Sequence, residues 1–217
     1  MRHKIIPWIL DLLYPTRCVL CGEHLTPGRP RICEKCLPAL PVADTLCRRG
    51  DFFTVSVSAL YYEGAVRDAI RRYKFRGVEA YYHAFGELVA ERIYRELDGA
   101  YDVLSWVPLA PDRLRERGYD QTKLIAQNAA KRLRKKLVPT LKKRRGVHPQ
   151  SLAGDKAARK ANIAGAYTAL RPERFSGKRV LLIDDITTTG STLSECAKTL
   201  LLAGAEEVVC ATLATTR

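Results

Sequence analysis

The sequence has no apolar run long enough to cross a lipid bilayer, which takes about 20 consecutive residues. The first residues faintly imitate a secretory signal, because Arg2, His3 and Lys4 precede an apolar stretch at positions 5–10. Asp11 interrupts that stretch, however, and no small-residue cleavage site follows it. These absences predict a cytoplasmic protein. A packing surface is expected where five apolar residues share one helical face, namely Ile5, Trp8, Ile9, Leu12 and Leu13.

The sequence also lacks the side-chain sets of covalent catalysis. Only four histidines are present, and no Ser-His-Asp or Cys-His constellation is apparent, so nothing supports a covalent intermediate. Acidic residues are scarce as well, with 23 Asp and Glu against 37 Lys and Arg, which gives a net charge of +14. Such an excess attracts nucleic acid, an anionic membrane surface or a polyphosphate, although solubility alone also explains a high charge.

Cysteines, in contrast, are concentrated near the start of the chain. Cys18-x-x-Cys21 and Cys33-x-x-Cys36 form two pairs separated by eleven residues, and four thiolates make a closed tetrahedral zinc site. Disulfides are the alternative, but they are disfavoured in a cytoplasmic chain. The spacing therefore predicts structural zinc. His24 and Cys47 are possible substitute ligands, and Cys196 and Cys210 are expected to be buried small residues.

The length of 217 residues suits one α/β domain with a small appendage. We expect residues 1–50 to form an N-terminal helix and a four-cysteine zinc-ribbon module, and residues 51–217 to form the larger domain. Within that domain, strands are expected at 55–62, 101–107, 138–141 and 206–213, and helices at 80–97 and 120–136.

The most informative segment has the order strand, acid pair, turn, helix. Residues 180–183 are typical of a buried parallel strand, and Asp184 and Asp185 mark its expected end. A turn rich in hydroxyl groups follows, before a helical pattern that includes Leu193. This order puts two carboxylates and free backbone N–H groups at the carboxyl end of a strand, where open α/β sheets bind their ligands.

The ligand implied by this segment is a ribose 5-phosphate unit. Amides and the positive end of the dipole at a helix start suit a phosphate monoester. The carboxylates would repel that phosphate, so they suit the sugar hydroxyls, either directly or through Mg²⁺ and its waters. The expected phosphate-binding residues are Thr187, Thr188, Thr189, Gly190, Ser191 and Thr192.

A basic loop is expected at the end of another strand. Pro108 and Pro111 stiffen it, and Arg113, Arg115 and Arg117 line it at alternate positions. Such a loop suits a diphosphate, through charge-assisted hydrogen bonds. The alternative is that these arginines are exposed and bind nothing.

A second set of cations follows the strand expected at 138–141. Lys143 and Arg145 belong to a run of four basic residues and are candidates to neutralise a diphosphate. Residues 146–160 are predicted to form a long mobile loop, and loops of this length are commonly active-site lids. Gln150, Ser151 and Arg159 are its hydrogen-bonding members.

An amphipathic helical pattern follows the first expected strand, with Val66, Ile70 and Tyr73 on its apolar face. Aromatic Tyr73 and Phe75 are interleaved with the cations of the polar face. Cations beside exposed aromatics suit a nucleic-acid backbone and its bases, and a solvated helix face is an equal alternative. The cations are Arg67, Arg71, Arg72, Lys74 and Arg76.

The acid-pair segment resembles the signature of type I phosphoribosyltransferases, which bind 5-phosphoribosyl 1-diphosphate. Taken over nearly its whole length, the chain resembles the ComF family of competence proteins. The matching parts are the two Cys-x-x-Cys pairs, residues 61–64 and 73–77, residues 107–119, residues 150–152, Arg159, Asn162 and the acid-pair segment. His148 departs from the family pattern, as does the abundance of small residues after Leu152.

The resemblance implies a type I phosphoribosyltransferase-like parallel sheet flanked by helices, and a role in DNA uptake. Asp184 and Asp185 would hold the ribose hydroxyls and Mg²⁺, as the catalytic acids, and the hydroxyl-rich turn would hold the 5-phosphate. Arg113, Arg115, Arg117 and a cation such as Lys143 or Arg145 would neutralise the leaving diphosphate.

Two classes of function remain open from the sequence. One is a competence protein that binds 5-phosphoribosyl 1-diphosphate with Mg²⁺ and single-stranded DNA, with DNA-uptake machinery as a possible partner. The other is an enzyme of the nucleotide-salvage type, which moves phosphoribose onto an unidentified base or other acceptor. A zinc-dependent adaptor with an inactive pocket fits less well, because the acid pair and turn are intact.

Overall fold

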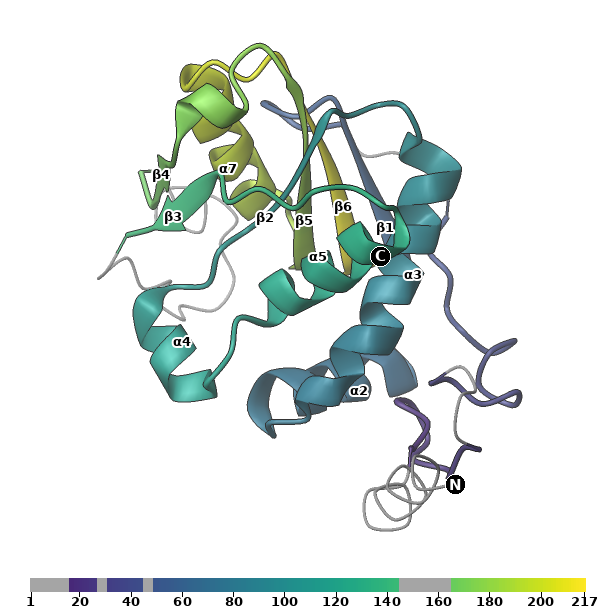
Figure 1. Ribbon diagram of the computed structural model, residues 1–217. Coiled ribbons are helices and arrows are strands. Elements are labelled where there is room, and N and C mark those ends of the chain that lie inside the picture. The colour runs from purple at the N-terminus through teal and green to yellow at the C-terminus, as the bar shows by residue number, and fades with distance from the viewer. Residues whose placement is uncertain (1–15, 27–30, 45–48, 145–164) are drawn as a thin grey trace, which may run out of the picture.

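The computed structural model describes residues 16–26, 31–44, 49–144 and 165–217 (Figure 1). Several expectations therefore lie outside the described residues: the N-terminal helical face, Cys47, Arg145, and the loop at 146–160 with Gln150, Ser151 and Arg159. Within the described residues, no helix is both long and apolar enough to span a membrane.

A four-stranded parallel sheet forms the centre of the protein. Its order is β1 (Val55–Tyr61), β6 (Glu207–Thr215), β5 (Arg179–Thr187) and β2 (Val103–Trp106). The register pairs Val57 with Ala211, and Ile183 with both Ala211 and Trp106. The fold is therefore α/β, with a parallel sheet flanked by helices, as the sequence predicts. The ranges expected at 55–62, 80–97 and 206–213 agree with β1, α3 and β6 to within two residues.

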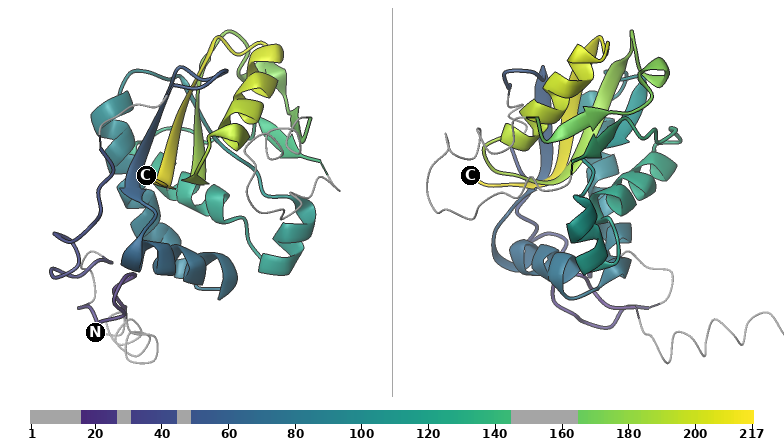
Figure 2. Two further views of the ribbon diagram at one scale, coloured as in Figure 1. Left: turned by 180° about the vertical axis from the view of Figure 1, so that it is seen from behind. Right: turned by 90° about the vertical axis from the view of Figure 1, so that its left-hand side faces the viewer.

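Helices cover both faces of this sheet (Figures 1 and 2). One face packs against α2 (Gly64–Phe75), α3 (Tyr82–Leu97) and α5 (Gln121–Arg132), and a 3₁₀ turn at Glu79–Tyr81 leads into α3. The other face packs against α7 (Ser191–Leu202). Because side chains alternate along a strand, Leu181 and Ile183 of β5 enter the first core, whereas Val180 and Leu182 enter the second.

Two segments differ from the expected elements. No main-sheet strand forms at the expected range 138–141: Leu137, just before it, makes a single bridge to Leu104, and the chain then leaves the main sheet. It forms β3 (Leu141–Lys143), which pairs antiparallel with β4 (Tyr167–Ala169) and is followed by a 3₁₀ turn at Pro172–Arg174. The basic loop expected after β2 is largely a helix, α4 (Pro111–Arg117), because Pro111 at its first turn needs no N–H partner.

The cysteine-rich segment packs directly onto the larger domain. Val19, Leu20 and Ile32 are buried in the same core as α2 and α3. Arg72 of α2 donates from Nη2 to the backbone carbonyls of Val19 and Leu20, at 2.9 and 3.0 Å. The N-terminal segment therefore shares its apolar core and a set of hydrogen bonds with the domain that carries the acid pair.

Candidate functional site

The acid pair lies inside β5 and not at its end, because the strand continues to Thr187. Successive side chains of a strand point to opposite faces, so the two carboxylates diverge. Asp185 shares the face of Ile183, toward α2 and α5, and Asp184 shares the face of Leu182, toward α7. Both residues are nevertheless buried, with Asp185 at 7% and Asp184 at 8% exposure of the whole residue. The expectation that both mark the strand end is corrected in this respect.

Asp185 is neutralised by a lysine from α2. Lys74 Nζ lies 2.9 Å from Asp185 Oδ1, and the two side chains are 16% and 10% exposed. The sequence analysis assigned Lys74 to the polar face of the helix and missed this role. The available signal was its spacing, because Lys74 follows the buried Ile70 by four residues and so lies next to the apolar stripe.

Gln121, the first residue of α5, holds the other oxygen of Asp185. Its Nε2 donates to Asp185 Oδ2 at 3.2 Å, and its backbone carbonyl accepts from the Tyr73 hydroxyl at 2.8 Å. The Gln121 side chain is buried, and its Oε1 has no hydrogen-bond partner in the described part of the chain. An orphaned acceptor beside a paired carboxylate suits a ligand hydroxyl or a water. Sequence reasoning did not identify Gln121.

Asp184 has a different environment. Its Oδ1 accepts from the backbone N–H of Asp185 at 2.8 Å. Burial, together with the neighbouring charge of Asp185, raises the pKa of Asp184 to about 8. Burial also raises the pKa of Tyr167, which lies near Asp184 and beneath the ammonium group of Lys143, 5.3 Å from the ring centroid. The two acids therefore differ in their surroundings as well as in direction.

The expected phosphate-binding residues form the turn between β5 and α7. We call residues 187–191 the phosphate loop. Gly190 adopts a left-handed conformation, with φ of 76°, directly before the first residue of α7. The Thr189 and Ser191 hydroxyls lie 2.8 Å apart, and the N–H of Ser191 donates to Thr189 Oγ1 at 3.4 Å. The turn thus places hydroxyls beside the amino end of a twelve-residue helix, which favours a bound anion.

The three candidate arginines are on α4 and make local contacts. Arg113 pairs with Glu116 at 3.1 Å, and the Arg117 guanidinium lies 5.0 Å from the centroid of the Phe75 ring. Arg115 is exposed. Because α4 is helical, Arg113 and Arg117, which are four residues apart, share one face, whereas Arg115 points to another. No contact with the acid pair is found for them among the described residues.

Asp120 fixes the chain just before α4. Its Oδ2 accepts from the backbone N–H of Leu109 at 3.2 Å and from Trp106 Nε1 at 3.4 Å, while Oδ1 caps α5 through the Lys123 N–H. A cavity of about 390 Å³ opens beside this loop, lined by Pro108, Leu109, Lys123, Lys142 and Lys143 among others. Lys143 therefore lines the cavity beside the loop after β2, and its charge also acts on Asp184.

Three of the residues expected to contact nucleic acid are also corrected. Tyr73 is fully buried, so it cannot stack on a base. Arg72 and Lys74 are committed to the contacts with Val19, Leu20 and Asp185. The exposed cations and aromatic ring of this helix are Arg67, Arg71 and Phe75, with Arg76 just after it, and Arg67 lies 3.6 Å from the carboxylate of the exposed Asp68.

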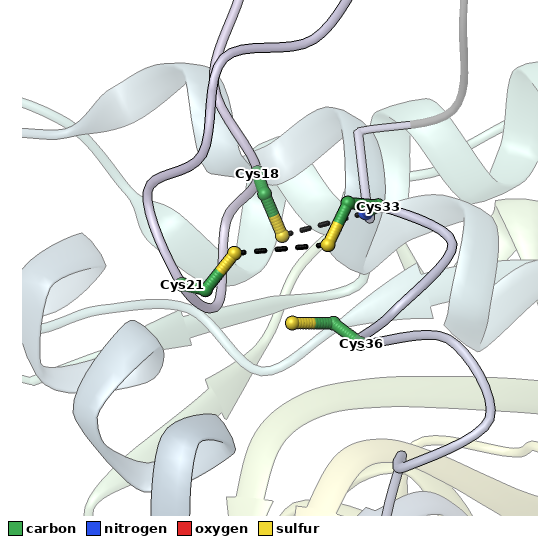
Figure 3. Close-up of side chains that lie close together, drawn as sticks. All are labelled: Cys18, Cys21, Cys33 and Cys36. Atoms are coloured by element: carbon green, nitrogen blue, oxygen red, sulfur yellow. Dashed lines mark hydrogen bonds between the residues drawn. The ribbon is translucent and has the colours of Figure 1, made fainter.

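Four cysteines converge from two turns near the N-terminus (Figure 3). The sulfur atoms of Cys18, Cys21, Cys33 and Cys36 all lie within 4.8 Å of one another, and those of Cys21 and Cys33 are 3.7 Å apart. A tetrahedral zinc ion with Zn–S bonds of about 2.3 Å requires sulfur separations of about 3.8 Å. The donor set therefore fits zinc. His24 does not join this cluster and instead bridges to Arg17.

The two turns are built by backbone hydrogen bonds that a Cys-x-x-Cys spacing permits. The Gly22 N–H donates to the Cys18 carbonyl, with Gly22 at φ of 79°, and the Cys36 N–H donates to the Cys33 carbonyl. Burial alone would raise the pKa of the Cys18 thiol, but N–H donors of Cys33, Cys21 and Leu20 lower it to about 6. Such donors favour the thiolate, which is the form that binds metal.

Comparison with known families agrees with both parts of the chain. Residues 9–50 match the double zinc ribbon domain, and residues 124–217 match the phosphoribosyl transferase domain. The fold and these matches define a protein with a zinc-ribbon module and a phosphoribosyltransferase-type α/β domain. The ribbon match and the cysteine cluster together support a structural zinc site.

Curated relatives then specify the family. Competence protein ComFC of Streptococcus pneumoniae is 30% identical over 167 residues, which cover 75% of this chain and 68% of that protein. ComFC of Bacillus subtilis is 25% identical over 86% of this chain and 72% of its own length. Competence protein F of Haemophilus influenzae is 37% identical over 47% of this chain, and the match spans 45% of that protein. The chain belongs to the ComF family of competence proteins.

Solved structures give a weaker likeness. A glutamine phosphoribosylpyrophosphate amidotransferase from B. subtilis is 22% identical, with a TM-score of 0.41, over 60% of this chain and 26% of that one. A structure described as the allosteric regulatory enzyme of purine biosynthesis has the same TM-score at 23% identity, over 60% of this chain and 25% of that chain.

Proposed function

We propose that this protein binds 5-phosphoribosyl 1-diphosphate with Mg²⁺ at the junction of β5 and α7, and that it serves in competence. The observation that carries the proposal is the union of a buried, lysine-paired Asp185 with a hydroxyl-rich turn at the amino end of α7. The turn suits the 5-phosphate, and the carboxylates suit the hydroxyls of the attached ribose.

The chain supplies a separate group for each part of this ligand. Backbone N–H groups and the hydroxyls of Thr189 and Ser191 bind the 5-phosphate. Asp185, oriented by Lys74 and Gln121, accepts from the ribose hydroxyls. Lys143 is proposed to meet the diphosphate on one side, and Arg113 and Arg117, which share one face of α4, are proposed to approach it from the other.

Oxygen donors at the acid pair also suit Mg²⁺, which prefers carboxylates, waters and substrate phosphates. Because the two carboxylates point to opposite faces of β5, one of Asp184 and Asp185 would hold the ion directly, together with the diphosphate, and the ion would neutralise charge that develops on that group. A divalent cation beside Asp184 also favours its ionised form, which burial otherwise disfavours.

A role in DNA uptake is proposed from the competence proteins that this chain resembles. The net charge of +14 and the exposed cations of α2 support contact with single-stranded DNA through its phosphates. Arg71 and Arg76, with the 63% exposed Phe75 between them, are the residues proposed for this surface. Such binding would weaken as salt increases, because these contacts release counterions.

Transfer of phosphoribose to an acceptor is the second candidate function. The cavity of about 390 Å³ beside Trp106, Tyr119 and Lys143 favours it, because this cavity gives room next to the loop where the diphosphate would leave. Positioning and charge stabilisation would be the protein's main contributions.

The binding proposal is tested by calorimetric titration of 5-phosphoribosyl 1-diphosphate and Mg²⁺ into zinc-loaded Asp184→Asn/Asp185→Asn protein. We expect this variant to lose the binding heat while keeping its fold, because each Asn conserves volume. Asp102→Asn is the matched control, since Asp102 pairs with Arg179 just before β2, at the opposite end of the sheet. Equal affinity in the double variant and the control would refute the assignment of the acids.

A further inference from the structure

A second cavity, of about 430 Å³, opens on the other side of the phosphate loop. It is lined by the loop, by one side of α7 and by the turn at residues 49–53 that precedes β1. The α7 residues Ser191, Ser194 and Lys198 follow one another at spacings of three and four, so they share a helical face. Seven residues of helix span about 10 Å, so the cavity is elongated, with the loop at one end and Lys198 at the other.

The end of the cavity away from the loop combines an aromatic ring with cations. Phe52 is 37% exposed, and Lys198 Nζ lies 5.5 Å from its ring centroid. Arg49 also lines the cavity, as do the acidic residues Asp51 and Glu195. Phe53 is buried beneath, and its ring lies 3.7 Å from the position that a Cβ would take on Gly190. An accessible ring beside cations suits the face of a nucleobase and a phosphate-bearing chain.

The volume is too large for a phosphate group alone. A phosphate takes roughly the space of two or three water molecules at about 30 Å³ each, and ligand sites commonly span about 300–1,000 Å³. A phosphate monoester at the loop would leave most of the 430 Å³ vacant. The remaining space accommodates a further group of nucleoside size.

The order of the strands in the sheet indicates which part of a bound ligand lies nearest to the 430 Å³ cavity. The sheet runs β1-β6-β5-β2, and the cavity extends from the loop after β5 toward the turn before β1. Lys143 and the loop after β2, where the diphosphate is expected, lie on the other side of β5. A group bonded to the 5-phosphate is therefore the part of such a ligand that would extend into the 430 Å³ cavity.

We propose that this cavity holds a nucleoside esterified to the phosphate at the loop, so that the site takes a nucleoside phosphodiester. The ligand has the chemistry of a strand's 3′ end, whose last sugar keeps free hydroxyls for Asp185 and whose preceding base stacks on Phe52. This inference rests on the proposed function of the phosphate loop and extends it from a sugar phosphate to a nucleic-acid terminus.

The charges of a phosphate monoester and a phosphate diester differ, so their relative affinities test the inference. A phosphate monoester carries nearly two negative charges at neutral pH, whereas a diester carries one. The amino end of α7 favours the more negative group, so a diester without cavity contacts binds more weakly than the monoester. Contacts of the second nucleoside with Phe52 and Lys198 are expected to make the diester bind at least as tightly as the monoester.

The test compares uridine 5′-monophosphate with the dinucleotide UpU on zinc-loaded wild-type protein, by calorimetry and by competition with 5-phosphoribosyl 1-diphosphate. UpU is expected to bind at least as tightly as the monophosphate and to displace the sugar diphosphate. If UpU binds tenfold or more weakly while the monophosphate and the sugar diphosphate both bind, the inference is overturned and the proposed function stands. If none of the three binds, both are overturned.

Variants then locate the second nucleoside. Phe52→Ala is expected to lower the ratio of UpU affinity to sugar-diphosphate affinity about tenfold, in the range of base-stacking contributions. Lys198→Ala is expected to lower the same ratio, although less. Tyr94→Ala is the matched control, because this ring is 64% exposed on α3 and lies outside the cavity. A ratio that changes equally in Phe52→Ala and Tyr94→Ala contradicts the placement, and retained binding of the sugar diphosphate shows that each variant is folded.

Discussion

At the scale of single residues, Lys74 and Asp185 form a nearly buried pair at the candidate site. Both oxygens of Asp185 have a donor, one from Lys74 and one from Gln121. Removal of one partner from a buried pair leaves the other charge desolvated and uncompensated. Lys74 therefore has a structural part in the free protein, besides any part in binding.

Lys74→Ala is expected to destabilise the protein by roughly 3 kcal/mol, because it strands the Asp185 carboxylate. Urea unfolding of the variant checks this, with the exposed Lys131→Ala as control. Adding Asp185→Asn to Lys74→Ala is expected to restore part of the loss, since the stranded charge disappears. Additive effects of the two substitutions would show that the pair does not interact.

Asp184 is expected to make the free energy of unfolding fall as pH rises. Most paired carboxylates have the opposite effect. Burial raises its folded pKa to about 8 from an ordinary value near 3.8, so between these values the folded state binds more protons than the unfolded state. Stability contributed by this group is therefore present at low pH and is lost as pH rises toward 8. Urea unfolding between pH 5 and 8 is expected to show this decline, and Asp184→Asn to flatten it. A decline that persists unchanged in Asp184→Asn would assign it to other groups.

At the scale of elements, α2 connects the cysteine cluster with the acid pair. Arg72 binds the carbonyls of Val19 and Leu20, which lie between two of the cysteines, and Lys74, two residues further on, binds Asp185. Tyr73 lies between them and donates to the Gln121 carbonyl. The same helix is thus held at both sites, so zinc binding and the acid pair are expected to be coupled.

Arg72→Ala is expected to weaken binding of the sugar diphosphate roughly fivefold while zinc content stays at one ion per chain. Chelation of zinc from the wild-type protein is expected to weaken it at least as much, because the metal supplies much of the folding energy of such a module. Calorimetry with parallel zinc analysis measures both. Arg95→Ala on α3 is the control, with a side chain 68% exposed. If Arg72→Ala bound the sugar diphosphate with wild-type affinity, the cysteine module and the acid-pair site would not be coupled.

Elements encoded by contiguous patterns could be predicted from the sequence. The Cys-x-x-Cys pairs, β5 and the turn before α7 are local, and residues 180–192 contain the whole strand–turn–helix order. Lys74 and Gln121 were missed because they meet Asp185 across 111 and 64 residues, which no local pattern encodes. Residues 111–117 were expected as a loop because Pro108 and Pro111 suggested one, although proline also fits a first helical turn.

At the scale of the whole molecule, two cavities flank the carboxyl side of β5, and the cysteine module packs on the helices of one sheet face. The whole chain carries an excess of 14 positive charges, and the proposed ligand is highly anionic. Such a field raises the encounter rate with anions and favours nucleic acid as a second ligand. Binding of the sugar diphosphate and of DNA is therefore expected to be linked.

The central claim is that the junction of β5 and α7 is a working sugar-phosphate site. Its most direct test is calorimetric titration of zinc-loaded protein with 5-phosphoribosyl 1-diphosphate and Mg²⁺, in the absence and presence of single-stranded DNA. We predict saturable binding of one sugar diphosphate per chain, with an affinity that shifts when DNA is added. Absence of binding heat in both titrations, from protein shown to be folded and zinc-loaded, would contradict the account.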